Sequence, residues 1–132
     1  MVTKQFTLYL PNRPGQLAVV LRRLAARRIN IEGISATSSV DIGLVQIVVS
    51  NAVVTRKLLD RAKLPFVAQN VVLVPLRNKP GALADIVSRL ARQGINVNYV
   101  YATACEGQSR CYAIISAPDL RRVEAACLTA RR

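Results

Sequence analysis

Two short segments of this sequence share a pattern whose residue types suit the binding of a small zwitterion. The pattern is Asn-x-Pro-Gly-x-Leu, and it occupies residues 12–17 and again residues 78–83. The glycine permits a sharp turn at which a ligand approaches the main chain. If a helix starts there, its first N–H groups carry the positive end of the helix dipole and offer a site for a carboxylate. The asparagine amide donates and accepts hydrogen bonds, which suits both charged ends of a zwitterion.

The candidate binding residues of these two turns are the asparagines, the adjacent cations, the glycines and the residues that supply the first helical amides. They are Asn12, Arg13, Gly15, Gln16 and Leu17 in the first copy, and Asn78, Lys79, Gly81, Ala82 and Leu83 in the second. Plainer interpretations exist for two of these residue types. An asparagine before a turn often only caps the turn, and a cation at a loop tip is usually only solvated.

The two motifs belong to a repeat of about 66 residues. Within the window from Asn12 to Thr37, twelve residues are identical, without gaps, to the residues 66 positions later. The identities include Arg23-Leu24-Ala25 with residues 89–91 and Ala36-Thr37 with residues 102–103. Chance does not produce this agreement, so the sequence predicts two copies of one unit, residues 1–70 and residues 71–132.

Each unit predicts a strand, a helix, two strands and a second helix, and the first unit adds a fourth strand. After each Pro-Gly turn, apolar residues recur at the spacing i, i+3, i+4, i+7, i+8 of an amphipathic helix. Gly94 lies where a helix C-cap favours glycine, whereas Arg28 occupies the matching place in the first unit. The predicted strands are 6–10, 29–35, 44–49, 66–69, 71–76, 95–103 and 111–116, and the second helices are 53–62 and 118–129.

This order predicts the α+β class, as a duplicated ferredoxin-like βαββαβ sandwich whose second unit lacks its last strand. That missing strand would lie beside the first strand of the second unit. We therefore expect the sheet edge at residues 71–76 to be either open or covered by a partner.

Composition narrows the class of protein. The 132 residues are 52% hydrophobic, which is too high for a disordered chain. No apolar run approaches the roughly 18 residues of a membrane span, and Pro11 interrupts the apolar start, so neither a membrane protein nor a secretory leader is expected. These features predict a folded cytoplasmic protein.

The sequence offers little for catalysis or metal binding. It contains no histidine, and its three cysteines, Cys105, Cys111 and Cys127, form no CxxC pair. The seven acidic residues show no paired or metal-ligand spacing. We therefore expect no enzyme activity, no catalytic residue, no metal site and no cofactor.

The net charge of +12, from 19 Lys and Arg against 7 Asp and Glu, raises nucleic acid as a partner. RNA-recognition modules share this order of elements and stack bases on aromatic residues of the central strands. Here the predicted third strands hold one aromatic residue, Tyr112, so nucleic acid is disfavoured. Most of the cations fall on the outer faces of the helices. A basic adaptor that binds an acidic protein or nucleic acid without an effector remains the alternative function.

The repeated Asn-x-Pro-Gly-x-Leu turn, followed by Ile29-Asn30-Ile31 and Ile95-Asn96-Val97, resembles the ACT domain. The resemblance covers both units and is similar to the stand-alone tandem ACT proteins, while residues 30–34 also resemble the regulatory subunit of acetolactate synthase. It implies that the chain binds an amino acid or related small metabolite and controls an enzyme of amino-acid metabolism allosterically.

The resemblance also implies further site residues and an assembly. It places the effector between paired units, with Asn30 and Ile31, or Asn96 and Val97, on the side opposite the turn. A helix of this length separates Asn12 from Asn30 by about 20 Å, so one unit does not bring them together, and a homodimer or higher oligomer is expected. Asn30 and Asn96 have a plainer interpretation as helix-exit residues. Tyr99 and Tyr101 replace Gly33 and Ser35, and either line the second pocket or pack in the core or an interface.

Overall fold

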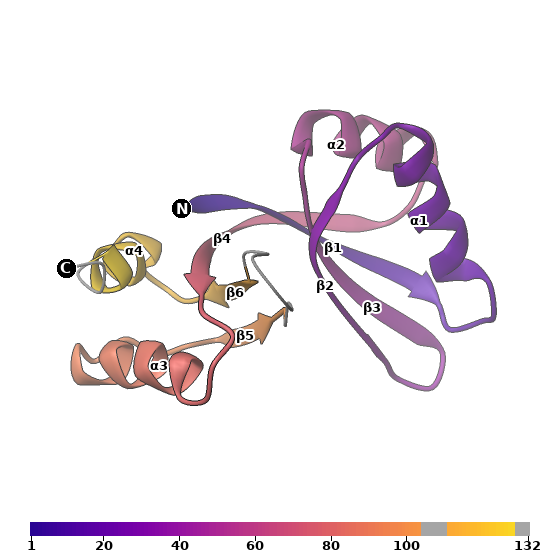
Figure 1. Cartoon of the computed structure of the whole chain (residues 1–132). Helices are drawn as coiled ribbons and strands as arrows, with labels where there is room; N and C mark the ends of the chain where they lie inside the picture. The colour runs from indigo at the N-terminus through magenta and orange to yellow at the C-terminus, as the bar shows by residue number, and fades with distance from the viewer. Residues whose placement is uncertain (104–110, 129–132) are drawn as a thin grey trace. The chain divides into compact units, whose positions relative to one another are not determined.

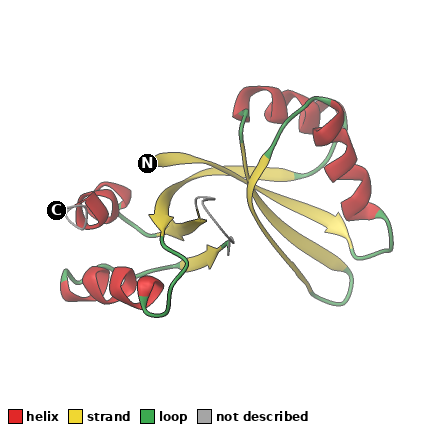
Figure 2. Cartoon of the chain, viewed as in Figure 1, coloured by secondary structure: helices red, strands yellow, loops and turns green. Residues whose placement is uncertain are grey.

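The computed structural model describes residues 1–103 and 111–128, and the chain divides into two compact units (Figures 1 and 2). The first, Lys4–Gln69, is called the N-terminal unit below. The second combines Met1–Thr3 with the chain from Asn70 onward and is called the C-terminal unit. The predicted boundary assigned residues 1–70 to one unit, whereas Met1–Thr3 belong structurally to the other.

The N-terminal unit contains the elements of a βαββαβ fold. They are β1 (Val2–Pro11), α1 (Gln16–Ala26), β2 (Ile31–Ser38), β3 (Ile42–Val49), α2 (Ala52–Arg61) and the start of β4 (Phe66–Leu76). In the sheet β1 lies between β3 and β4, and β2 is the outer neighbour of β3. The antiparallel register places Leu8 opposite Val45, and both pack with Leu24 of α1 in one core. Leu59 of α2 lies in the same core, so both helices cover the same face of the sheet.

The C-terminal unit repeats this arrangement. It contains the end of β4, α3 (Ala82–Arg92), β5 (Tyr99–Ala102), β6 (Cys111–Ser116) and α4 (Leu120–Leu128), with β6 between β4 and β5. Val72, Ile115 and Val123 lie in its core. The duplicated ferredoxin-like fold predicted from the sequence is confirmed. No helix in the described ranges is long and apolar enough to cross a membrane.

Several element boundaries differ from the prediction, and the hydrogen bonds explain two of these differences. The strand expected over residues 95–103 starts only at Tyr99, because the Ile95 amide donates to the Leu90 carbonyl at 3.0 Å and prolongs the exit from α3. The helix expected from Pro118 begins at Leu120. Asp119 is its N-cap, since a carboxylate oxygen of Asp119 accepts a hydrogen bond from the Arg122 amide at 3.2 Å.

Strand β4 joins the two units without a break. Residues 66–69 and 71–76, predicted as separate strands, form one strand, Phe66–Leu76. Its second half lies beside the chain's first residues: the Leu73 amide donates to the Met1 carbonyl at 2.8 Å. The Met1 ammonium donates to the Leu73 carbonyl at 3.1 Å and lies 3.2 Å from a carboxylate oxygen of Glu124. The edge expected to be open or partner-covered is therefore paired, at Leu73, by the start of β1, where the missing last strand would lie.

The two repeats leave their first helices in the same way with different residues. Gly94 follows α3 with φ 67°, and Arg28 follows α1 with φ 55°. The amides that come next, those of Ile29 and Ile95, each donate at 3.0 Å to a helical carbonyl, of Leu24 and Leu90 respectively. Arg28 thus adopts a left-handed conformation that the repeat assigns to glycine.

Candidate ligand-binding site

The Pro-Gly turns of the two units have nearly identical geometry. Gly15 has φ 86° and Gly81 has φ 88°, and each precedes a helix as its N-cap. A Cβ atom built on either glycine meets no atom within 4 Å. Glycine is therefore required by the left-handed backbone and not by lack of space. The loop before each turn is also shared, because Arg13 and Lys79 donate to the carbonyls two residues earlier at 2.8 and 2.9 Å.

The first helical amides are only partly available. The Gln16 amide donates to the Arg13 carbonyl at 3.3 Å, and the Ala82 amide does the same to Lys79, so these two amides are used within the turn. The first helical hydrogen bond of α1 runs from the Val19 amide to the Gly15 carbonyl. Between them, the amides of Leu17 and Ala18 have no hydrogen-bond acceptor among the residues that the structure describes. They are donors at the positive end of the α1 dipole.

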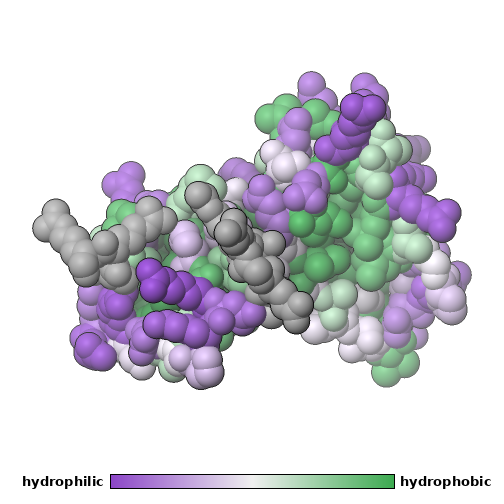
Figure 3. Space-filling model, viewed as in Figure 1, coloured by the Kyte–Doolittle hydropathy of each residue, from purple (hydrophilic) through white to green (hydrophobic). Residues whose placement is uncertain are grey.

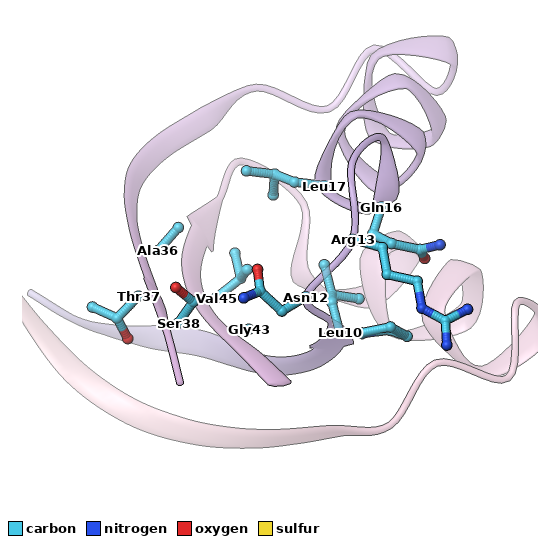
Figure 4. Close-up of a pocket in the computed structure, with 11 residues that line it drawn as sticks. Leu10, Asn12, Arg13, Gln16, Leu17, Ala36, Thr37, Ser38, Gly43 and Val45 are labelled. Atoms are coloured by element: carbon cyan, nitrogen blue, oxygen red, sulfur yellow. The ribbon is translucent and has the colours of Figure 1, made fainter. Parts of the chain in front are cut away.

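Asn12 fastens the turn to the β2–β3 hairpin. Its side-chain amide donates to the carbonyls of Ser39 and Val40 at 3.1 and 3.3 Å, and its backbone amide donates to the Asp41 carbonyl at 2.9 Å. Asn12 therefore stabilises the turn, as its plainer interpretation predicts. In Figure 4 the carboxamide oxygen of Asn12 points toward the side on which Leu17 lies. The oxygen is the part of Asn12 that remains to accept a hydrogen bond from a ligand.

A pocket of about 200 Å³ lies in front of this turn (Figure 4). Its walls come from the end of β1, the start of α1, the hairpin end of β2 and the start of β3. The residues that line it are Leu10, Pro11, Asn12, Arg13, Gln16, Leu17, Ala36, Thr37, Ser38, Gly43 and Val45. Figure 4 shows the polar ends of Arg13 and Gln16 at the rim, directed away from Asn12.

The structure brings together some of the predicted site residues of the N-terminal unit. Asn12, Arg13, Gln16 and Leu17 line the pocket, and Gly15 shapes the turn without lining it. Asn30 and Ile31 lie beyond the opposite end of α1, outside the pocket. The Asn30 backbone is tied to Ser50, whose hydroxyl accepts from the Asn30 amide at 2.9 Å.

Sequence reasoning missed the far wall of the pocket. That wall consists of Ala36, Thr37 and Ser38 on β2 with Gly43 and Val45 on β3. The sequence did contain a signal for this wall, because Ala36-Thr37 is one of the few pairs of residues that recur identically in both repeats. A glycine inside a strand, such as Gly43, also marks a place of close backbone approach.

The corresponding region of the C-terminal unit differs in the side chains that surround the turn. Cys111 is opposite Leu76 in the sheet as Gly43 is opposite Leu10, and Cys111 is 2% exposed. Ala82 replaces Gln16, and Asp85, in the first turn of α3, replaces Val19. The buried thiol of Cys111 therefore takes the position at which Gly43 leaves the first pocket without a side chain. The carboxylate of Asp85 lies near the start of α3.

The remaining predicted residues of the C-terminal unit fall on two segments at opposite ends of α3. Asn78, Lys79 and Gly81 lie in the exposed turn before α3, and Ala82 and Leu83 open the helix. The second segment, Asn96 and Val97, follows the helix. Among the described residues, no group of three or more Cys, Asp or Glu side chains is placed to hold a metal ion.

The two tyrosines of β5 face away from the turn motif. Tyr101 is opposite Ile114, which lies on the other face of the sheet from core residues Ala113 and Ile115. The rings of Tyr99 and Tyr101 stack with centroids 6.4 Å apart. Burial, with a smaller contribution from Tyr99, raises the pKa of Tyr101 above its ordinary range. The tyrosines therefore do not line a pocket at Gly81.

The fold and site together define a class: a duplicated βαββαβ protein with a pocket of about 200 Å³ at a glycine turn. The family model described as ACT domain pair matches residues 1–116, and the chain belongs to this family.

Solved structures share this fold. The crystal structure of protein BT0572 from Bacteroides thetaiotaomicron is 25% identical with a TM-score of 0.88, and the match covers 99% of this chain and 90% of that chain. The ligand-free regulatory subunit of aspartate kinase from Thermus thermophilus is 20% identical with a TM-score of 0.69, covering 100% and 96%. The regulatory subunit from Thermus flavus is 18% identical with a TM-score of 0.58, covering 99% and 93%. The search of curated proteins found no match.

Proposed function

We propose that the pocket of the N-terminal unit binds a small amino acid, or a related carboxylate metabolite, and that binding regulates a metabolic enzyme. Membership of the ACT family supports a regulatory, non-catalytic role that depends on a ligand. The observation that carries the proposal is the meeting, in a pocket of about 200 Å³, of the α1 N-terminus with the side chain of Asn12.

Each part of an amino acid has a complement in this pocket. The carboxylate would accept hydrogen bonds from the amides of Leu17 and Ala18 at the positive end of α1. The ammonium would donate to the side-chain oxygen of Asn12. The side-chain nitrogen of Asn12 already donates to the Ser39 carbonyl of the β2–β3 hairpin. Leu10 and Val45 supply an apolar floor for a short side chain.

The proposal assigns the N-terminal unit as the effector-binding one. Gly43 leaves the floor of its pocket open, whereas Cys111 is buried at the equivalent place of the C-terminal unit. The carboxylate of Asp85 also repels an anion from the start of α3. We expect one amino acid per chain.

Regulation requires that the ligand bind one arrangement of the protein more tightly than another. The pocket is lined by four elements, β1, α1, β2 and β3, so a bound ligand would hold the turn against the hairpin. Homodimerisation is part of the proposal, because Asn30 lies beyond the end of α1 and reaches a ligand at Asn12 only from another copy. The regulated enzyme would contact this assembly in the cytoplasm.

Thermal unfolding with each of the twenty amino acids tests the proposal. A ligand at about one hundred times its Kd stabilises the folded chain by about 2.7 kcal/mol. The expected result is a raised Tm with one amino acid or a small group, confirmed as one site per chain by calorimetry. Asn12→Ala should abolish the shift, and Asn78→Ala, its matched control in the second repeat, should preserve it.

Two results contradict the proposal. If no amino acid or related carboxylate changes the Tm, the effector function is wrong and the basic adaptor without an effector takes its place. If a ligand binds equally well to Asn12→Ala and to the unaltered chain, the function holds and the site is wrong.

A further inference from the structure

A second hollow lies on the helical face of the N-terminal unit, between α1 and α2. It has a volume of about 310 Å³, and its lining residues are Arg23, Ala26, Arg27, Leu58, Arg61 and Ala62. Ala26, Leu58 and Ala62 form an apolar floor, and the three arginines surround it. We call this surface the arginine groove. Figure 3 shows hydrophilic side chains projecting from the helical part of this unit, beside hydrophobic surface.

The C-terminal unit shows what the same kind of surface does when its arginines are used internally. Arg89, the repeat partner of Arg23, donates from α3 to the Ala126 carbonyl of α4 at 3.5 Å. Arg122 donates from α4 to the Gln93 carbonyl after α3. These arginines fasten the two helices to each other.

The arginines of the groove make no such bonds. The guanidinium groups of Arg23, Arg27 and Arg61 form no hydrogen bond or ion pair with any residue that the structure describes. The nearby Arg56 differs, since its guanidinium lies over the rings of Phe6 and Phe66 at 6.0 and 5.7 Å from their centroids. Three guanidinium groups, each with five donors, therefore surround the groove with unused hydrogen-bonding capacity.

The charge around the groove is strongly one-sided. Helices α1 and α2 and the short segments after them carry eight cations, and Asp60 is their single acid. The cations are Arg22, Arg23, Arg27, Arg28, Arg56, Lys57, Arg61 and Lys63. Cations stabilise a helix C-terminus by about 0.3–1 kcal/mol, mainly within the last turn. This effect accounts for Arg61 and one or two others but not for the whole set.

We propose that the arginine groove is a docking surface for an acidic amphipathic segment of a partner protein. Arginine binds carboxylates bidentately, and the floor of Ala26, Leu58 and Ala62 would receive apolar side chains placed between those carboxylates. A nucleic acid would use the charge and leave the apolar floor without a complement, and no aromatic side chain lines the groove to stack a base. Charge complementarity and the apolar floor together favour an acidic protein segment over a nucleic acid as the occupant of the groove.

Fluorescence anisotropy with designed probes tests this inference. The first probe is a labelled 14-residue helical peptide with glutamate on one face and leucine on the other. The second replaces its leucines with glutamine at the same charge, and the third is a 20-nucleotide oligo-dT. At 50 mM NaCl we expect the Glu/Leu peptide to bind at least tenfold more tightly than either of the others.

Matched variants locate the binding. The triple variant Arg23→Ala, Arg27→Ala, Arg61→Ala should weaken the Glu/Leu peptide by tenfold or more. A control with the same charge loss, Arg77→Ala, Arg92→Ala, Arg121→Ala, should weaken it by less than threefold. Circular dichroism confirms that both variants are folded.

The inference is overturned if both triple variants lose affinity equally, if the glutamine peptide or oligo-dT binds as tightly, or if no peptide binds. These outcomes are separate from the effector experiment, because none of the six arginines lines the pocket at Asn12. The Tm response to the amino acid should be the same in both triple variants as in the unaltered chain.

Discussion

Replacing Arg28 with glycine should stabilise the protein. Arg28 has φ 55° at the exit from α1, where the second repeat has Gly94 with φ 67°. A side-chain-bearing residue in this conformation costs about 1–2 kcal/mol, and the greater backbone freedom of glycine in the unfolded chain returns about 0.5–1 kcal/mol of that gain. The net expectation for Arg28→Gly is a stabilisation of about 0.5–1 kcal/mol.

Calorimetry measures this difference as a shift in Tm. An unfolding entropy of about 2.1 cal/mol/K per residue, over 132 residues, converts the expected gain into a rise of about 2–4 °C if the chain unfolds as one unit. The reciprocal variant, Gly94→Arg, should lower the Tm by a similar or larger amount. The experiment is done without ligand, so that only folding contributes.

Relief of charge repulsion is the main competing explanation for a stabilisation by Arg28→Gly, since Arg28 lies among other cations. Arg28→Ala removes the same charge but keeps a side chain at positive φ. We expect Arg28→Ala to be less stable than Arg28→Gly by most of the predicted gain. Equal Tm values for these two variants would refute the conformational reasoning and assign any stabilisation to relief of charge repulsion.

Three further predictions concern the site, a tyrosine and a helix cap. Gly43→Cys should lower amino-acid affinity about tenfold, or 1.4 kcal/mol, measured by calorimetry, with little change in fold, because its Cβ would lie 3.6 Å from the Leu10 carbonyl oxygen, an ordinary contact. Tyr101 has a raised pKa, so the stability from its protonated form is complete below about pH 10 and is lost as the pH rises further. Tyr101→Phe should therefore lose less stability between pH 9 and 11, and parallel pH curves for the two proteins would contradict this. Asp119→Ala should cost about 1 kcal/mol in urea unfolding, whereas an unchanged midpoint would mean that the cap contributes nothing.

Much of the fold was predictable because the same sequence pattern occurs in both repeats. Agreement between repeats identified the helices after Gly15 and Gly81, and the Pro-Gly turns located their starts. One error arose where two predicted strands follow each other without a turn residue. The predicted strands 66–69 and 71–76 are separated at Asn70, a residue type depleted in strands, but the chain continues through it as one strand.

The candidate site was predictable in part. The residues next to Gly15 belong to one local segment, so a motif finds them. The opposite wall depends on which residues of β2 and β3 the fold brings back, and the contact of Asn12 with the Ser39 carbonyl spans 27 residues. The periodicity of the sequence does not encode such a contact. The two turns also have different surroundings, with Gly43 near the first and Cys111 near the second. This difference depends on the strand registers.

The pairing of Met1 with Leu73 makes the C-terminal unit depend on the first residues of the chain. The hydrogen bond between them joins residues 72 positions apart, so it forms only after more than half of the chain has been synthesised. A fragment that starts at Asn70 would expose the backbone of β4 at Leu73, and an unpaired strand edge is a template for association with other chains. The C-terminal repeat expressed without the first residues of the chain would therefore have an unpaired strand edge.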